Sequence, residues 1–225
     1  MVHGKALVVV DTQVDFFQID SLKTKDTTEM IRVINELLPK FETIIFTKDI
    51  HKPNSKFFNT SHEYKNEFDL FETNGKFDML WPEHCIENDR GSDLYEGLNL
   101  SRMSGNFYIF KKEENENRHV YSGFDNTELD VFLDEKGIDE LFVCGMHLDF
   151  AVKETCLDAV KLGFKTNLII NGTCHLFDEE MTDSYIELFE NDVKLVESHE
   201  INDNIMIKVK GIDNVLKLIE ENYEV

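Results

Sequence analysis

The stretch ELFVCGMHLDFAVKETC, residues 140–156, decides the fold of this chain. It begins with an apolar run of the length of a buried strand, and a helical pattern over 151–162 follows after a short turn. The same order recurs elsewhere, since apolar runs alternate with amphipathic stretches along the chain. This alternation predicts strand–helix–strand units and a parallel sheet.

Five apolar runs are predicted to be strands buried on both faces. They are KALVVVD (5–11), TIIFTK (43–48), FYIFK (107–111), ELFVCG (140–145) and KTNLIIN (165–171). Helices are predicted over 27–40, 127–136, 151–162 and 178–191, with a closing strand and helix over 205–210 and 212–223. We therefore expect an α/β protein with three layers, α/β/α, around a central, mainly parallel sheet.

The chain has 225 residues, enough for one domain with a substantial core, and we expect residues 1–225 to form a single domain. Residues 50–104 interrupt the alternation, because they are rich in Asn, Asp, Glu and Phe and show weak periodicity. Loops of this length inside a compact domain are usually functional. We predict that this segment is a lid or a binding loop.

Composition excludes several classes of function. A formal net charge of −22 is unsuited to nucleic acid, which needs clustered Lys and Arg. No apolar run approaches the roughly 20 residues that span a bilayer, and the opening MVHGKALVVVD lacks the features of a signal peptide. The four cysteines form no CxxC pair and indicate reduced thiols. We expect a cytoplasmic protein that binds neither nucleic acid nor membrane.

Polar residues follow the predicted strands at their carboxyl ends, where open parallel sheets bind ligands. The first strand ends at Asp11, the second at Asp49 and His51, and the third at the pair Lys111 and Lys112. The fourth leads into the turn over 145–152. We expect these ends to converge on one site.

A metal site is predicted at the second of these ends. Asp49 and His51 are two residues apart, so in an extended segment both side chains leave the same face. The pattern taken alone also fits a surface loop. His84 in WPEHC, beside Trp81 and Pro82, is a plausible third ligand. Together the three would suit Zn²⁺ or Fe²⁺ with water in the remaining positions, which would make 50–104 a loop that binds metal and substrate.

The order of these motifs resembles the nicotinamidase branch of the isochorismatase-like cysteine hydrolases. The resemblance covers about three quarters of the chain, over residues 5–172. It rests on ALVVVDTQVDF, TKDIHKPN, WPEHC, a lysine before YSGF, and the turn GxxxDxxV followed by KETCLDAVKLGFKT. It implies the isochorismatase-like hydrolase fold, a divalent metal (zinc or iron) and hydrolysis of nicotinamide to nicotinic acid and ammonia, a step of NAD salvage. We also expect a homo-oligomer.

The resemblance assigns roles to individual residues. Asp11 would be the base that deprotonates the nucleophile, and Lys112 would stabilise the thiolate. We prefer Lys112 to Lys111 because it lies nine residues before Tyr121, although strand alternation does not separate these neighbours. Backbone N–H groups near His147 and Ala151 would form the oxyanion hole, and the family's cis peptide would map to Met146–His147.

Aromatic side chains are candidates for holding a flat pyridine ring, with core packing as the alternative for each of them. The four are Phe16, Trp81, Tyr121 and Phe150.

The nucleophile of the family would sit at Ala151, and a methyl group cannot attack a carbonyl. Cys156 lies about 140° around the helix and about 7.5 Å further along it, so it should point elsewhere. Cys85 and Cys144 are expected to be structural. The chain should therefore not form an acyl-enzyme intermediate.

Two accounts explain this alanine. In one, an active nicotinamidase carries a deliberate change of cysteine to alanine; in the other, the chain is a natural relative that binds without catalysis. We favour the first, because a natural loss should let Asp11, Lys112 and the metal residues drift. Another amide hydrolase of the superfamily need not keep the metal residues, and an isochorismatase proper would lack them.

Two further departures concern the surroundings of the site. Many relatives carry a second histidine shortly after the D-x-H motif, whereas here the nearest candidates are Ser55 and His62. Phe150 and Leu148 differ from the commonest choices on the substrate side. We expect the metal to hold more water than usual, and the fine substrate specificity does not follow from the resemblance.

Overall fold

A parallel sheet of six strands forms the centre of the protein, in the order β5-β2-β1-β6-β7-β8. The computed structural model describes residues 4–201 except 74 and 116. The strands of the sheet are β1 (Gly4–Val10), β2 (Thr43–Ile50), β5 (Asn106–Glu113), β6 (Ile138–Met146), β7 (Lys165–Cys174) and β8 (Lys194–Val196). A separate antiparallel hairpin consists of β3 (Leu70–Thr73) and β4 (Lys76–Met79).

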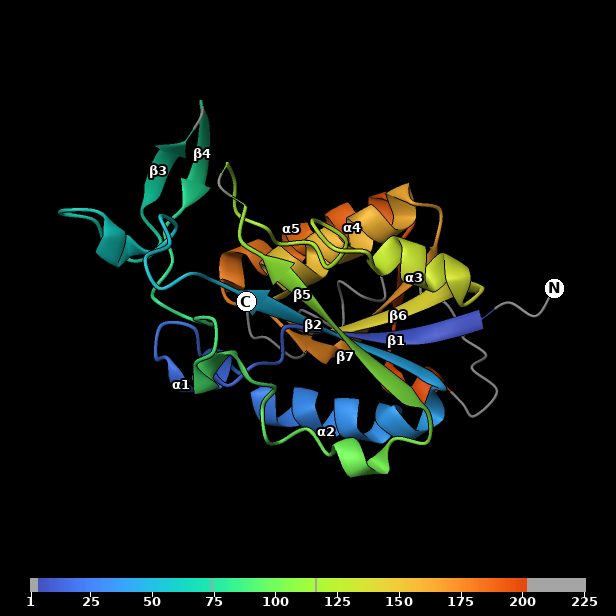
Figure 1. Cartoon of the computed structure of the whole chain (residues 1–225). Helices are drawn as coiled ribbons and strands as arrows, with labels where there is room; N and C mark the ends of the chain where they lie inside the picture. Colours follow the sequence, from blue (N-terminus) through green and yellow to red (C-terminus); the bar gives the residue numbers. More distant parts are fainter. Residues whose placement is uncertain (1–3, 74, 116, 202–225) are drawn as a thin grey trace.

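Helices cover both faces of the sheet, as Figure 1 shows. They are α1 (Asp15–Gln18), α2 (Thr27–Leu37), α3 (Leu129–Glu135), α4 (Lys153–Lys161) and α5 (Asp178–Glu190). Shorter turns are η1 (Leu38–Lys40), η2 (Asn59–Ser61), η3 (Arg90–Ser92), η4 (Leu100–Arg102), η6 (Ser198–Glu200) and the π-helical turn η5 (Leu148–Val152). α2 lies on one face, and α3, α4 and α5 lie on the other. The predicted three-layer α/β/α fold is confirmed.

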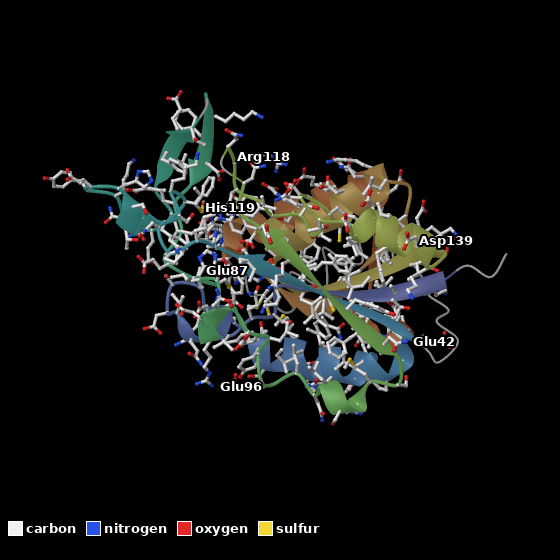
Figure 2. All side chains as sticks on the ribbon, in the orientation of Figure 1. Glu42, Glu87, Glu96, Arg118, His119 and Asp139 are labelled. Carbon is white, nitrogen blue, oxygen red and sulfur yellow. The ribbon has the colours of Figure 1, made fainter. Side chains whose placement is uncertain are left out.

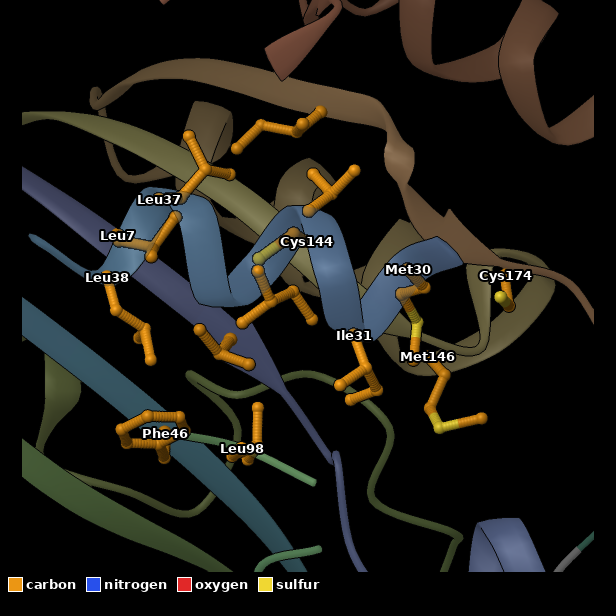
Figure 3. Close-up of a cluster of buried hydrophobic side chains, with 14 of the residues drawn as sticks. Leu7, Met30, Ile31, Leu37, Leu38, Phe46, Leu98, Cys144, Met146 and Cys174 are labelled. Carbon is orange, nitrogen blue, oxygen red and sulfur yellow. The ribbon is translucent and has the colours of Figure 1, made fainter. Parts of the chain in front are cut away.

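Two large apolar clusters form the core, one on each face of the sheet, and a small third cluster of Phe57, Phe71 and Leu80 lies in the segment over 50–104. Figure 3 shows Leu37 of α2 close to Leu7 of β1, and Met30 of the same helix close to Met146 of β6. These helix residues recur at helical spacing, so α2 buries one continuous face. β1 is buried from Ala6 to Val10 because both of its faces are covered.

Within residues 4–201, the predicted strands and helices are found, with one correction. FYIFK (107–111) is β5, which is an edge strand and not buried on both faces: Phe107 is 43% exposed and Ile109 is 45% exposed. The short strand β8 and the β3–β4 hairpin were not predicted. The closing strand and helix over 205–223 lie outside the described residues.

The first part of the segment over 50–104 lies at the carboxyl ends of the strands and carries the hairpin, which projects from the sheet in Figure 1. Its last part passes along α2, where Asn35 Nδ2 donates to Gly97 O (2.9 Å), and reaches the amino end of β5. His51 N donates to Cys85 O (3.0 Å) and Glu87 N donates to His51 O (2.9 Å), so the segment returns to the end of β2. This return brings His84 to the sheet. That residues 1–225 form a single domain stays a prediction.

Within the part of the chain that the structure describes, no helix combines the length and apolarity needed to cross a membrane.

Candidate active site

The carboxyl ends of β1, β2, β5 and β6 converge as expected. Asp49 lies opposite Lys112 in the register of β2 and β5. Gly145 in β6 approaches β1 so closely that a Cβ there would lie 2.2 Å from Val10 O, and its φ is +113°. Only glycine fits this position. It lets the turn after β6 lie against Asp11, which itself has a φ of 45°.

Asp11 and Lys112 form a buried ion pair. Lys112 Nζ donates to Asp11 Oδ2 (2.5 Å) and to Tyr121 O (3.0 Å), and it lies 4.0 Å from Asp49 Oδ1. Thr47 Oγ1 donates to the other oxygen of Asp11 (2.6 Å). Lys112 is 1% exposed, whereas its neighbour Lys111 faces solvent.

Burial sets the proton affinities of this pair. Burial raises the pKa of Asp11, and the charge of Lys112 offsets only part of this rise. Burial disfavours the charged form of Lys112, but attraction to Asp11 and Asp49 outweighs it and raises the pKa of the ammonium. Lys112 is therefore a fixed positive charge beside a carboxylate that binds a proton more readily than an exposed aspartate does.

Ala151 lies in η5, directly before α4, and lines the same pocket as Asp11 and Lys112. The expected cis peptide joins Met146 and His147. The ring of His147 donates from Nε2 to Leu22 O (3.2 Å), and burial lowers its pKa to about 3, so the ring is neutral. The imidazole therefore fixes the turn without adding charge.

Asp49, His51 and His84 bring one ligand atom each within 4.8 Å of one another, and all three side chains are buried. His51 Nε2 lies 3.1 Å from Asp49 Oδ2, and His84 Nε2 lies 3.4 Å from the same oxygen. Ligands about 2.0–2.1 Å from one zinc ion would be separated by about 3.0–3.4 Å. Both separations from Asp49 Oδ2 fit a single divalent cation.

The outer nitrogen of His84 has the partner that a metal-binding histidine requires, whereas that of His51 faces a carboxylate without a hydrogen bond to it. His84 Nδ1 donates to Pro82 O (2.8 Å), which leaves Nε2 with a free lone pair. His51 Nδ1 lies 3.5 Å from Glu114 Oε2. Burial lowers the pKa of His51, but the charge of Asp49 outweighs it and raises the pKa to about 9. A cation at this position would displace the proton that His51 otherwise holds.

Gln13 holds Asp49 from behind, a role that the sequence did not indicate. Its Nε2 donates to Asp49 O (2.9 Å) and to Ser92 O (3.0 Å), and its Oε1 accepts from Asp49 N (2.7 Å). Asp15 Oδ2 similarly accepts from Cys85 N (2.7 Å), next to His84. Both residues belong to the DTQVDF motif, so this motif anchors the segment that carries Asp49 and the segment that carries His84.

The four predicted aromatic residues line the same pocket. Trp81 packs edge-on against Phe150 with ring centroids 4.8 Å apart, and its Nε1 donates to Tyr121 Oη (3.2 Å). Phe16 packs against His84 (5.4 Å) and His147 (5.2 Å). Phe16 thus lies between the candidate metal ligand His84 and the turn at His147. The other three aromatic side chains contact one another and form one continuous wall.

The pocket is narrow, with about 20 Å³ of space for water, which is room for about one molecule. A larger cavity of about 530 Å³ lies outward of His119 and Tyr121 and is lined also by Arg118, Asp125 and Glu154. The chemical groups lie in the smaller pocket, so we assign the site there.

The other candidate metal ligands and the cysteines lie away from the cluster of Asp49, His51 and His84 or in the apolar core. Ser55 and His62 are not in the metal cluster; His62 Nε2 lies 2.7 Å from Lys56 O instead. Cys85 and Cys144 are buried in one apolar cluster and Cys156 in the other, as expected for structural thiols. Sequence reasoning missed Glu114 and His119, because neither belongs to a quoted motif or a periodic element.

Comparison with known proteins agrees with this geometry. The chain matches the Isochorismatase domain family over residues 5–200. A nicotinamidase of Escherichia coli is 33% identical over 178 residues, covering 75% of this chain and 82% of that protein. The solved nicotinamidase/pyrazinamidase of Acinetobacter baumanii is 30% identical with a TM-score of 0.81, covering 89% of this chain and 99% of that one. A pyrazinamidase of Pyrococcus horikoshii, solved in complex with zinc, is 26% identical with a TM-score of 0.67 and covers 86% and 98%. The chain therefore belongs to the isochorismatase family, in its nicotinamidase branch.

Proposed function

We propose that this protein is a nicotinamidase whose nucleophile position holds alanine, so that the chain binds nicotinamide and does not hydrolyse it. The observation that carries the proposal is one pocket lined by Asp11, Lys112 and Ala151 together with the metal residues Asp49 and His84. The relatives named nicotinamidase support the substrate. With cysteine at position 151 the reaction would convert nicotinamide and water to nicotinic acid and ammonia, a step of NAD salvage.

With cysteine at position 151, the surrounding residues would carry out each step of this hydrolysis. Asp11 takes the thiol proton, and the positive charge of Lys112 stabilises the thiolate. The sulfur attacks the carboxamide carbon, and the N–H groups of His147 and Ala151 stabilise the oxyanion. Asp11 returns its proton to the departing ammonia. Asp11 then accepts a proton from the water that hydrolyses the thioester.

Asp49, His51 and His84 would hold the divalent metal, as zinc or iron. When bound, the metal would supply Lewis-acid character toward the pyridine nitrogen. Phe16 and the wall of Trp81, Tyr121 and Phe150 would clasp the ring. The solved relative that contains zinc supports the choice of metal.

The second candidate function is a natural nicotinamide-binding protein without catalysis. Ala151 favours it, since the chain has no thiol in the pocket among its described residues. Another amide hydrolase of the superfamily would need Asp11 and Lys112 but no metal residues. The buried triad therefore favours a pyridine carboxamide.

Calorimetry on the chain as it stands tests the substrate. Nicotinamide should bind the zinc-loaded protein and bind at least tenfold more weakly after zinc is removed. Benzamide has the same carboxamide without the ring nitrogen, and it should show little dependence on zinc. Equal binding of the two amides would contradict the proposed recognition.

We also propose that the protein acts in the cytoplasm as a homo-oligomer. Four buried free thiols suit a reducing compartment. The exposed Phe107 and Ile109 on the edge strand β5 support association between copies. Sedimentation of the purified protein tests the oligomeric state.

A further inference from the structure

His119 is a buried histidine beside the metal residues that no motif accounts for. Figure 2 shows it between the carboxyl ends of the strands and the β3–β4 hairpin. It is 5% exposed and lines the pocket that also contains Asp49 and His84. Its ring centroid lies 5.2 Å from that of His51 in an edge-on arrangement. His119 therefore belongs to the metal side of the pocket.

The ring of His119 is held firmly. It stacks on Tyr121 with centroids 4.5 Å apart and an angle of 13° between the planes. Phe57 packs against it at 5.1 Å. The backbone N–H of His119 donates to Asp78 Oδ2 on β4 (2.9 Å). These contacts fix where the ring nitrogens lie, as a preorganised site requires.

Neither ring nitrogen of His119 has a hydrogen-bond partner among the described residues. A buried polar group without a partner costs about 1–3 kcal/mol, so phenylalanine would pack in this place at lower free energy. A buried imidazole with this cost calls for an explanation, and a hydrogen-bond partner outside the protein chain supplies one. The pocket beside it is the place where such a partner can lie.

Direct binding of the metal by His119 does not fit the geometry. The residues whose ligand atoms lie within 4.8 Å of one another are Asp49, His51 and His84, and His119 is outside that group. The pocket has about 20 Å³ of space for water, and a water molecule needs about 10–15 Å³. The pocket lined by His119, Asp49 and His84 therefore has room for about one water molecule.

We propose that His119 is a positioning residue of the metal site, whose ring hydrogen-bonds a water molecule on the open side of the cation held by Asp49, His51 and His84. This inference rests on the metal of the proposed function. It does not rest on the substrate. Partners of this kind typically change metal affinity by about 10–100-fold when they are removed.

The test is the zinc affinity of His119→Phe, measured by competition with a chelator on the chain as it stands. Phenylalanine keeps the flat ring against Tyr121 and removes both nitrogens. We expect zinc binding to weaken by about 10–100-fold and the Co²⁺ absorption spectrum to change. The melting temperature of the metal-free variant should be unchanged or higher, because no hydrogen bond within the protein is lost.

Two further variants complete the experiment. His62→Phe is the matched control, since His62 lies outside the metal cluster and bonds Lys56 O, and its zinc affinity should equal that of the parent. His119→Gln retains a hydrogen-bonding group and should give an intermediate affinity; it also serves if the phenylalanine variant fails to fold. Unchanged zinc affinity in both His119 variants, or a parent that binds no zinc, would overturn the inference. A parent that binds zinc but not nicotinamide would defeat the proposed substrate alone.

Discussion

The ammonium of Lys112 lies 2.5 Å from the carboxylate of Asp11, and both side chains are almost completely buried. Removing one partner leaves the other charge buried without compensation, which destabilises proteins by about 3–5 kcal/mol. Lys112→Met should therefore lower the free energy of unfolding by about that amount. Adding Asp11→Asn should restore much of the loss. Urea denaturation followed by Trp81 fluorescence gives the free energy of unfolding of the parent, Lys112→Met, Asp11→Asn and the double variant. If the losses of the two single variants add up in the double variant, the two residues are not coupled.

Gln13 should matter for metal binding although it does not touch the metal. Gln13→Ala leaves the backbone N–H and C=O of Asp49 without their side-chain partner. We expect zinc affinity to fall by about 10–100-fold and stability to fall by about 1–3 kcal/mol. Gln18→Ala, on an exposed helix position, is the control and should change neither. Equal zinc affinities for the two variants would show that the clamp on Asp49 is not needed.

The four native thiols should be unreactive in the folded protein. All are buried, and burial raises the pKa of Cys85, Cys144 and Cys156, and that of Cys174 to about 12. A thiol introduced by Ala151→Cys lies in the pocket beside Lys112 and should be the only one that reacts quickly with a disulfide reagent at pH 7. The unchanged chain is the control. Comparable labelling of the two proteins would place position 151 out of reach of solvent and of Lys112.

Activity restored by Ala151→Cys should depend on the ionisation of Asp11. Burial raises the pKa of this carboxyl, so protonation begins at a higher pH than for an exposed aspartate. As the pH falls through the raised pKa, the base is lost and kcat/KM declines, with a midpoint above the usual value of about 3.9. Rates measured with excess zinc, and with metal content determined at each pH, separate this effect from loss of the cation. A midpoint at or below 3.9 would contradict the burial of the base.

The sequence predicted the features that depend on local pattern. Runs of apolar residues gave the central strands, and the positions of Asp11, Asp49 and Lys112 at strand ends were enough to place them in one site. Alternation did not distinguish Lys112 from Lys111, whereas in the structure Lys112 lies against Asp11 and Lys111 faces solvent.

Other features depend on which segments meet in space. Whether β5 is an edge strand follows from the strand order, which its own sequence does not encode. Glu114 directly follows β5 and lies near His51 because β5 pairs with β2, with Glu113 opposite Ile50. His119 lies in the irregular segment after β5, and its contact with His51 follows from no pattern in its own segment. Gln13 was visible in a motif, but its bonds to Asp49 join residues 36 positions apart.

The most direct test of the account is ammonia release from nicotinamide by the zinc-loaded Ala151→Cys variant. The unchanged chain and Ala151→Cys combined with Asp11→Asn are measured beside it. We predict turnover by the first, none by the unchanged chain, and a rate about 10²–10⁴-fold lower for the combined variant, the range for loss of a general base. No ammonia from Ala151→Cys, although zinc and nicotinamide both bind, would contradict the account and leave a protein that only binds its ligand.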